Sequence, residues 1–250
     1  MRILILFFLI FSHALLFAQE NPIAFVVHGG AGNMAREAFT PEMEKEYTAK
    51  LDEAVSKGYE ILQAGGTALD AIEAAIIILE NSPLFNAGKG AVYTADGRNE
   101  LDASIMDGKT VQAGAVAGVR TIKNPIIAAR RVMDSSPHVM MAGNGAEQFA
   151  KGQNIVFVDT SYFYDEKRIK QLQRIKAKEE EGRGFLTPIE QMDYKFGTVG
   201  AVALDKDGNI AAGTSTGGMS NKKYGRIGDS PIIGAGTYAN NKTCGVSATG

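Results

Sequence analysis

The sequence has 250 residues, of which 45% are hydrophobic and 22% are charged, an ordinary composition for one globular domain with a full core. The formal net charge is −2 and no basic stripe is present, which argues against a nucleic-acid partner. Cys244 is the only cysteine, which excludes an intrachain disulfide.

Residues 1–18 have the features of a secretory signal peptide. Arg2 precedes an apolar run from Ile3 to Phe17, and the small residue Ala18 ends it. A retained membrane anchor is the alternative, because the run reaches the lower length limit for a spanning helix. No cluster of Lys or Arg follows to stop transfer. We therefore expect cleavage near Ala18 and a periplasmic or secreted protein that has no membrane attachment afterwards.

The next segments predict a strand and two helices. Residues 23–32, IAFVVHGGAG, read as a buried strand that runs into a glycine turn without the spacing of a phosphate loop. Thr40 and Pro41 can begin a helix, and Gly65 marks its end. Its predicted apolar face comprises Tyr47, Leu51, Val55, Tyr59 and Leu62. Thr67 can cap a second helix, which is apolar nearly all round and is therefore expected to be buried.

The middle of the chain alternates between strand and helix patterns. Residues 100–119 predict two strands joined at Asp107 and Gly108, and a helix, a strand and a short helix follow. In residues 165–183 the pattern changes, because twelve of the nineteen residues are charged. Such a composition predicts a linker, at about 162–192, that cannot order itself by burying apolar surface. A solvated surface helix is the alternative for its first half.

Two further strands flank the turn at Lys206–Asn209, and a third is predicted at 243–250. Residues 213–217 match the G-x-S-x-G pattern of serine hydrolases. That pattern needs a helix directly after the serine and a histidine later in the chain. Residues 217–221, GGMSN, are a poor start for a helix, and His28 and His138 both come earlier than the serine. The histidines also lack the spacing of metal ligands, so no metal site of that kind is expected.

Thr198 is a stronger candidate nucleophile. A threonine hydroxyl needs an adjacent base, and cleavage of the bond before Thr198 would free an α-amine with a pKa of about 7.7–8.0. Gly197 has no side chain to block attack on its carbonyl. The charged segment supplies a tether before the bond, and the strand from Val199 supplies rigidity after it. An ordinary Gly-Thr pair at the start of a strand is the alternative.

Several long motifs occur in one order along the chain: NSPLFNAGKGAVYTADG, NELDASIMDG, GTVGAVALDKDGNIAAGTSTGG and GRIGDSPIIGAGTYAN. With HGGAG at residues 28–32, they make the sequence resemble the plant-type L-asparaginase/isoaspartyl peptidase family of N-terminal-nucleophile hydrolases. The resemblance implies that Thr198 is the nucleophile, freed by autocleavage between Gly197 and Thr198. Thr216 would orient or activate it. Thr249 and Gly250 would form the oxyanion hole and contact the substrate.

The resemblance also implies a substrate-binding loop. Arg226 would hold the substrate α-carboxylate and Asp229 its α-ammonium group, with Ile227 and Gly228 between them; an ion pair on a surface loop is the alternative. Asn86 would lie near the nucleophile, unless it only forms a turn. No cofactor is required, although a structural sodium ion is implied for the loop at Leu79–Lys89.

The implied fold is α+β, a four-layer αββα sandwich that assembles as a dimer of autocleaved αβ units. Residues 19–197 would form the α subunit and 198–250 the start of the β subunit. Since that subunit continues further in the family, we expect a fragment. The expected function is that of an exported isoaspartyl peptidase and L-asparaginase that acts on isoaspartyl dipeptides. A glycosylasparaginase and an inactive, uncleaved aspartyl-binding homologue remain alternatives.

Overall fold

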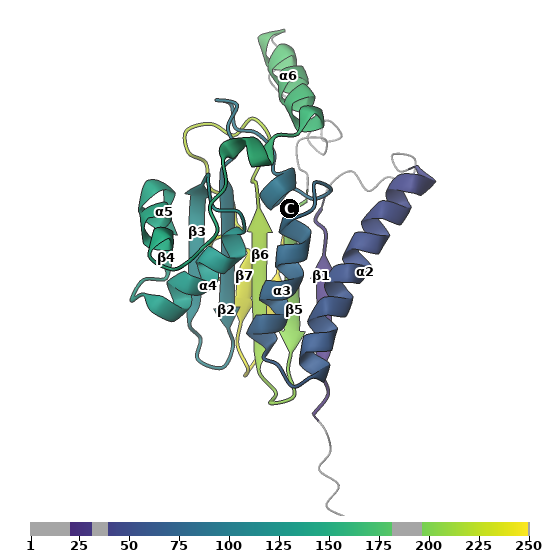
Figure 1. The fold of residues 1–250 in the computed structure, drawn as a ribbon, viewed down its shortest axis with the longest axis vertical. Helices are drawn as coiled ribbons and strands as arrows, with labels where there is room; N and C mark the ends of the chain where they lie inside the picture. The colour runs from purple at the N-terminus through teal and green to yellow at the C-terminus, as the bar shows by residue number, and fades with distance from the viewer. Residues whose placement is uncertain (1–20, 32–39, 182–196, 250) are drawn as a thin grey trace, which may run out of the picture.

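The computed structural model describes residues 21–31, 40–181 and 197–249. Its centre is a six-stranded sheet in the order β1-β5-β6-β2-β3-β4 (Figure 1), antiparallel except where β4 joins β3. The strands are β1 (Ala24–His28), β2 (Leu101–Asp107), β3 (Ala113–Val119), β4 (Met140–Ala142), β5 (Val199–Leu204) and β6 (Ile210–Thr216).

Helices cover one face of this sheet and a second, smaller sheet lies on the other (Figure 1). The helices are α2 (Pro41–Gln63), α3 (Ala68–Glu80), α4 (Pro125–Ser135) and α5 (Gly143–Lys151), with short 3-10 turns η2 (Gly88–Gly90) and η3 (Thr160–Phe163). The smaller sheet pairs β7 (Thr237–Ala239) with β8 (Gly245–Ser247), which pack on β2, β5 and β6. The fold is thus mixed α and β in three layers, and the fourth layer of the predicted sandwich stays a prediction.

Both predicted helix starts are confirmed. The Thr40 hydroxyl accepts a hydrogen bond from Met43 N at 3.2 Å and caps α2, while the Thr67 hydroxyl accepts one from Asp70 N at 3.1 Å and caps α3. The apolar face predicted for α2 is wrong at Tyr59, which is 41% exposed. Gly58 is buried in its place, because the Phe25 ring packs so closely that a Cβ there would overlap it.

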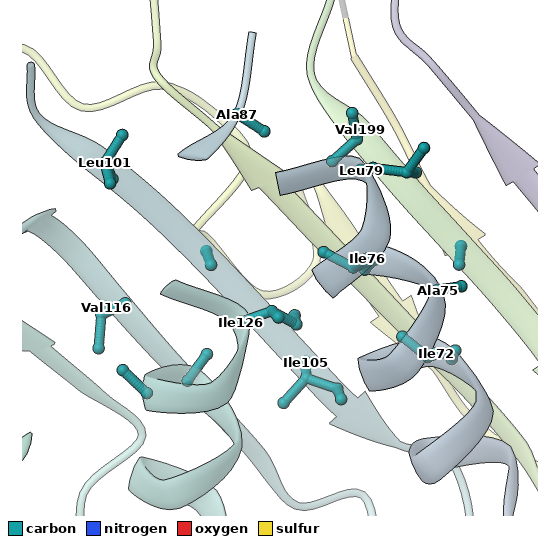
Figure 2. Close-up of a cluster of buried hydrophobic side chains, with 14 of the residues drawn as sticks. Ile72, Ala75, Ile76, Leu79, Ala87, Leu101, Ile105, Val116, Ile126 and Val199 are labelled. Carbon is teal, nitrogen blue, oxygen red and sulfur yellow. The ribbon is translucent and has the colours of Figure 1, made fainter. Parts of the chain in front are cut away.

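The core is centred on α3, which is buried as its composition predicts (Figure 2). Ile72 and Ile76 point from this helix toward β6, where Gly213 leaves room for them. A Cβ at Gly213 would lie 2.7 Å from Ile72 Cγ2, closer than carbon atoms can approach. Val199 of β5 faces the same core. The glycine therefore lets the helix lie directly against β6, the strand that ends at Thr216.

The charged segment is partly helical. Helix α6 spans Glu166–Glu180, and the Asp165 carboxylate caps it by accepting from Arg168 N at 3.0 Å. Leu172 and Ile175 are buried on one side of this helix, which projects beyond the sheet (Figure 1). The expectation that this composition stays unordered is wrong for its first half, where the surface-helix alternative holds. The remainder of the predicted linker, about 182–192, and the predicted signal peptide lie outside the described residues.

A layer of hydroxyl groups joins the two sheets. The Ser247 hydroxyl lies 2.9 Å from His28 Nε2 and 2.7 Å from Thr214 Oγ1. Thr237 donates to Thr214 Oγ1 at 2.5 Å, and Ser104 Oγ lies 2.7 Å from Thr237 Oγ1. These side chains come from β1, β2, β6, β7 and β8, so each strand of the smaller sheet is hydrogen-bonded to the larger one. Their mutual hydrogen bonds offset the cost of burying polar groups.

Across the three described ranges, no helix has both the length and the apolar character that crossing a bilayer would require.

Truncation of the core should be costly. We expect Ile76→Ala to lower the free energy of unfolding by about 2–5 kcal/mol, because it removes buried methyl groups and leaves a cavity. Val156→Ala, at a position 58% exposed, should change it by less than about 0.5 kcal/mol. Urea unfolding of both variants measures the difference. Equal losses would contradict this description of the core.

His28 should make stability depend on pH. Burial lowers the pKa of His28, and the neighbouring Thr198 backbone offsets part of that shift. The pKa of His28 is therefore lower in the folded state than the value of about 6.5 in the unfolded state, and the neutral histidine stabilises the fold above that value. This contribution is lost as the pH falls toward the folded-state pKa, because the unfolded state binds the proton first. We expect unfolding free energies between pH 7 and pH 5 to fall less in His28→Gln than in the parent. The exposed His138→Gln should follow the parent, and a parallel fall in all three would contradict the assignment.

Candidate active site

Thr198 and Thr216 meet at one end of the sheet. Val199 of β5 pairs with Ser215 of β6, so Thr198 comes opposite Thr216 and the two side chains share a face. Thr198 Oγ1 donates to Thr216 Oγ1 at 3.0 Å, and the Ser230 hydroxyl lies 3.5 Å from the same Thr198 atom. Thr198 is only 6% exposed. The structure thus brings the predicted nucleophile and its predicted partner into direct contact.

The peptide bond before Thr198 packs against the glycine turn that follows β1. A Cβ at Gly30 would overlap the Gly197 backbone, and one at Gly197 would overlap Gly30. Gly30 also has φ +112°, which L side chains rarely adopt. The Gly197 carbonyl accepts a hydrogen bond from Asn86 N at 3.3 Å. Two glycines in contact therefore fix the position of the carbonyl beside the Thr198 hydroxyl.

Asn86 does more than form a turn. Its Nδ2 donates to Gly218 O at 2.7 Å, its Oδ1 accepts from Val92 N at 3.0 Å, and its backbone carbonyl accepts from Gly217 N at 3.0 Å. The Gly218 N–H in turn donates to Thr216 Oγ1 at 3.0 Å. Asn86 thereby ties its own loop to the turn after β6, and that turn supplies a hydrogen bond to Thr216.

A small cavity of about 40 Å³ opens above these hydroxyl groups. Its lining comprises Ala31, Thr198, Thr216, Gly218, Met219, Arg226, Gly228, Asp229, Ser230 and Thr249. Among the described residues no ion pair joins Arg226 to Asp229, so the surface-pair alternative is not observed and both charges face the cavity. Ile227 is absent from the lining and is 44% exposed. Gly250 lies outside the described residues.

Ser230 is the residue of the cavity lining with a polar side chain that sequence reasoning missed. It is fully buried, and its carbonyl accepts from Ser104 Oγ at 2.6 Å, which connects it to the hydroxyl layer between the sheets. Its only signal in the sequence is its position directly after Asp229. The residue type alone does not separate it from an ordinary turn serine.

The serine-hydrolase alternative is excluded by the orientation of Ser215. This side chain points to the helix-covered face and donates to Glu80 Oε1 at 2.7 Å, while Thr214 and Thr216 point to the other face. Glu80 is fully buried, which raises its pKa to about 7 despite the hydrogen bonds from Ser215 and Ile126 N. Between residues 216 and 249, all described, no helix follows the serine, and His28 contacts Ser247 instead.

The described residues contain no group of three or more His, Cys, Asp or Glu side chains that could hold a metal ion. The predicted sodium loop is different, because it would use backbone carbonyls. A Cβ at Gly88 would overlap Glu80 O, and one at Gly90 would lie 2.6 Å from Pro83 O and overlap Phe85 O. Carbonyl oxygens thus lie close to two glycines of this loop, and oxygens of that kind suit a hard cation. The sodium ion itself stays a prediction.

Comparison with known proteins gives a consistent result. The family model described as "Asparaginase" matches residues 21–250. An isoaspartyl peptidase of Salmonella typhimurium is 51% identical over 231 residues, covering 92% of this chain and 74% of the relative. The isoaspartyl peptidase of Escherichia coli is 50% identical, covering 90% and 70%. A plant-type L-asparaginase of Pyrococcus abyssi is 46% identical, covering 91% and 73%.

Contact between the two glycines beside Thr198 should be essential to the fold. Gly30→Ala introduces both backbone strain and overlap with Gly197, whereas Gly65→Ala, at φ +84°, introduces strain in open space. We expect Gly65→Ala to lower the free energy of unfolding by about 1–2 kcal/mol and Gly30→Ala to cost about 1–3 kcal/mol more. Urea unfolding tests this. Equal losses would mean that Gly30 and Gly197 are not held in contact.

Proposed function

The chain belongs to the asparaginase family, and from this membership we propose that it hydrolyses β-aspartyl amide bonds as an isoaspartyl peptidase and L-asparaginase. The observation that carries the proposal is the hydrogen bond from Thr198 Oγ1 to Thr216 Oγ1 at 3.0 Å, beneath a cavity lined by Arg226 and Asp229. A paired hydroxyl nucleophile and two opposite charges suit a substrate that carries an amide, a carboxylate and an ammonium group.

The proposed enzyme first activates itself. Thr198 Oγ attacks the Gly197 carbonyl carbon, the C–N bond breaks, and the hydroxyl proton passes to the departing nitrogen, which becomes the free α-amine. Water then hydrolyses the resulting ester. The fixed Gly197 carbonyl and the N–H of Asn86 aimed at it support this step, since a donor at that oxygen would stabilise the developing negative charge.

The freed α-amine then acts as the base. It removes the proton from Thr198 Oγ, the oxygen attacks the substrate β-amide carbon, and the protonated amine gives its proton to the leaving amine. Water releases aspartate from the ester. We assign Thr249 and Gly250 to the oxyanion, supported by the position of Thr249 at the cavity.

Recognition of the substrate would rest on Arg226 and Asp229. A guanidinium can hold a carboxylate by two parallel hydrogen bonds, and a carboxylate neutralises an ammonium group. Gly228 supports this assignment, because a Cβ there would lie 2.9 Å from Arg226 Nη1 and displace the guanidinium. Ile227 is proposed only as the exposed link between these residues.

The proposal extends to maturation and assembly, with support from the family and the sequence. Residues 1–18 direct export to the periplasm or beyond, cleavage separates the α subunit 19–197 from the β subunit that starts at Thr198, and two αβ units form a dimer with the four-layer αββα fold. Backbone carbonyls of Glu80, Pro83 and Phe85 would hold a structural sodium ion that stiffens the loop and takes no part in the chemistry.

Activity assays with β-aspartyl-leucine, L-asparagine and a glycosylated asparagine test the proposal. We expect the parent to hydrolyse β-aspartyl-leucine, and Thr198→Ala to lose more than about a thousandfold in kcat because the nucleophile is gone. Thr243→Ala, at an exposed threonine, is the matched control and should retain full activity. Exclusive action on the glycosylated substrate would indicate a glycosylasparaginase, and binding of aspartate without turnover an inactive homologue.

A further inference from the structure

We infer that Lys222 and Asp102 form a buried ion pair that positions the Gly217–Gly218 turn, and through it the Thr216 hydroxyl, for the reaction. The inference rests on the proposed function and adds two positioning residues to it. Neither residue lines the cavity above Thr198.

The first observation is the burial of two opposite charges. The side chain of Lys222 is 2% exposed, and lysine is almost never buried to this extent unless it is paired. Its Nζ donates to Glu100 O at 3.2 Å and lies 3.6 Å from Glu100 Oε2 and 4.0 Å from Asp102 Oδ2. Asp102 is fully buried. Because a buried ion pair is often no more stabilising than apolar side chains of similar size, stability alone does not account for it.

The second observation is the place of Asp102 in the sheet. Asp102 of β2 is the direct partner of Thr216 of β6, and Thr216 adjoins Thr198, the residue directly before β5. Opposed residues of antiparallel strands point to the same face, so these three side chains form one row across neighbouring strands. Asp102 Oδ1 accepts from Gly118 N at 2.8 Å, where the β2–β3 pairing shifts register. The carboxylate is therefore held in place one strand away from Thr216.

The third observation is the contact of Lys222 with the turn. A Cβ at Gly218 would lie 3.2 Å from both Cδ and Nζ of Lys222, so the lysine side chain packs directly against the turn. The Gly218 carbonyl is held as well, because it accepts a hydrogen bond from Asn86 Nδ2 at 2.7 Å. Gly218 has φ +77°, a conformation that glycine adopts readily, so the turn has no side chain of its own at this position and is contacted by Lys222 and Asn86 instead.

The turn acts on Thr216 through one hydrogen bond. The Gly218 N–H donates to Thr216 Oγ1, the same oxygen that accepts from the Thr198 hydroxyl. A hydroxyl oxygen has two acceptor sites, so the position of the Gly218 N–H decides which one is left for Thr198. Movement of Lys222 would therefore be transmitted to the orientation of the Thr198 hydroxyl, although the two residues need not touch.

The test compares Lys222→Met, Asp102→Asn, the double variant and Lys223→Met. Lys223 is the matched control, since it is the adjacent lysine but is exposed and pairs with Glu179 at 2.9 Å. Steady-state kinetics with β-aspartyl-leucine should give kcat about 10- to 100-fold lower for each single variant in the pair, with KM within about twofold of the parent. The double variant should lose no more than the worse single variant, and Lys223→Met should match the parent.

An unchanged kcat in folded Lys222→Met would overturn the inference, as would a double variant whose loss equals the product of the two single losses. If Lys222→Met does not fold, the double variant removes both buried charges and leaves only the partly exposed Glu100 without its lysine partner. An unchanged kcat in that protein overturns the inference equally. A parent without hydrolytic activity would refute the proposed function instead. In that case, crystal structures of the parent and of the folded variant test the inference. Retention of the 3.0 Å hydrogen bond from Gly218 N to Thr216 Oγ1 in the variant would contradict positioning by the ion pair.

Discussion

The pairing register of β5 and β6 is the constraint on which the site depends. It places the Thr198 hydroxyl 3.0 Å from Thr216 Oγ1, and a slip by one residue would turn every side chain of β5 to the opposite face. Packing specifies the register on both faces. Ile72 and Ile76 of α3 fit against Gly213 on one side, and on the other the Thr214 hydroxyl is bound by Ser247 and Thr237.

Burial of the polar groups at this end of the sheet costs desolvation free energy, and hydrogen bonds between them offset it. Asn86 satisfies backbone groups of two loops at once, and Ser104 joins Ser230 to the hydroxyl layer. The cavity consequently has rigid walls on the side of the nucleophile. Arg226, by contrast, is exposed, which suits its proposed role of exchanging water for a substrate carboxylate.

Local patterns in the sequence predicted much of this arrangement. The caps at Thr40 and Thr67, the burial of α3 and the β5–β6 hairpin all follow from residues close together in the chain. Tyr59 and α6 were predicted less well, because a glycine packed on Phe25 and two buried apolar residues outweighed the local pattern. Ser230 and the ion pair of Lys222 with Asp102 depend on contacts between distant segments, which composition and spacing do not encode.

The central claim is that Thr198 becomes the amino-terminal residue of the mature enzyme. Intact mass and amino-terminal sequencing of the folded, purified full-length protein, beside Thr198→Ala, test it most directly. The account predicts two pieces from the parent, one beginning at Thr198, and a single uncut chain from the variant. A folded parent that remains uncut would leave Thr198 without its base and contradict the account, as would a variant cut at the same bond.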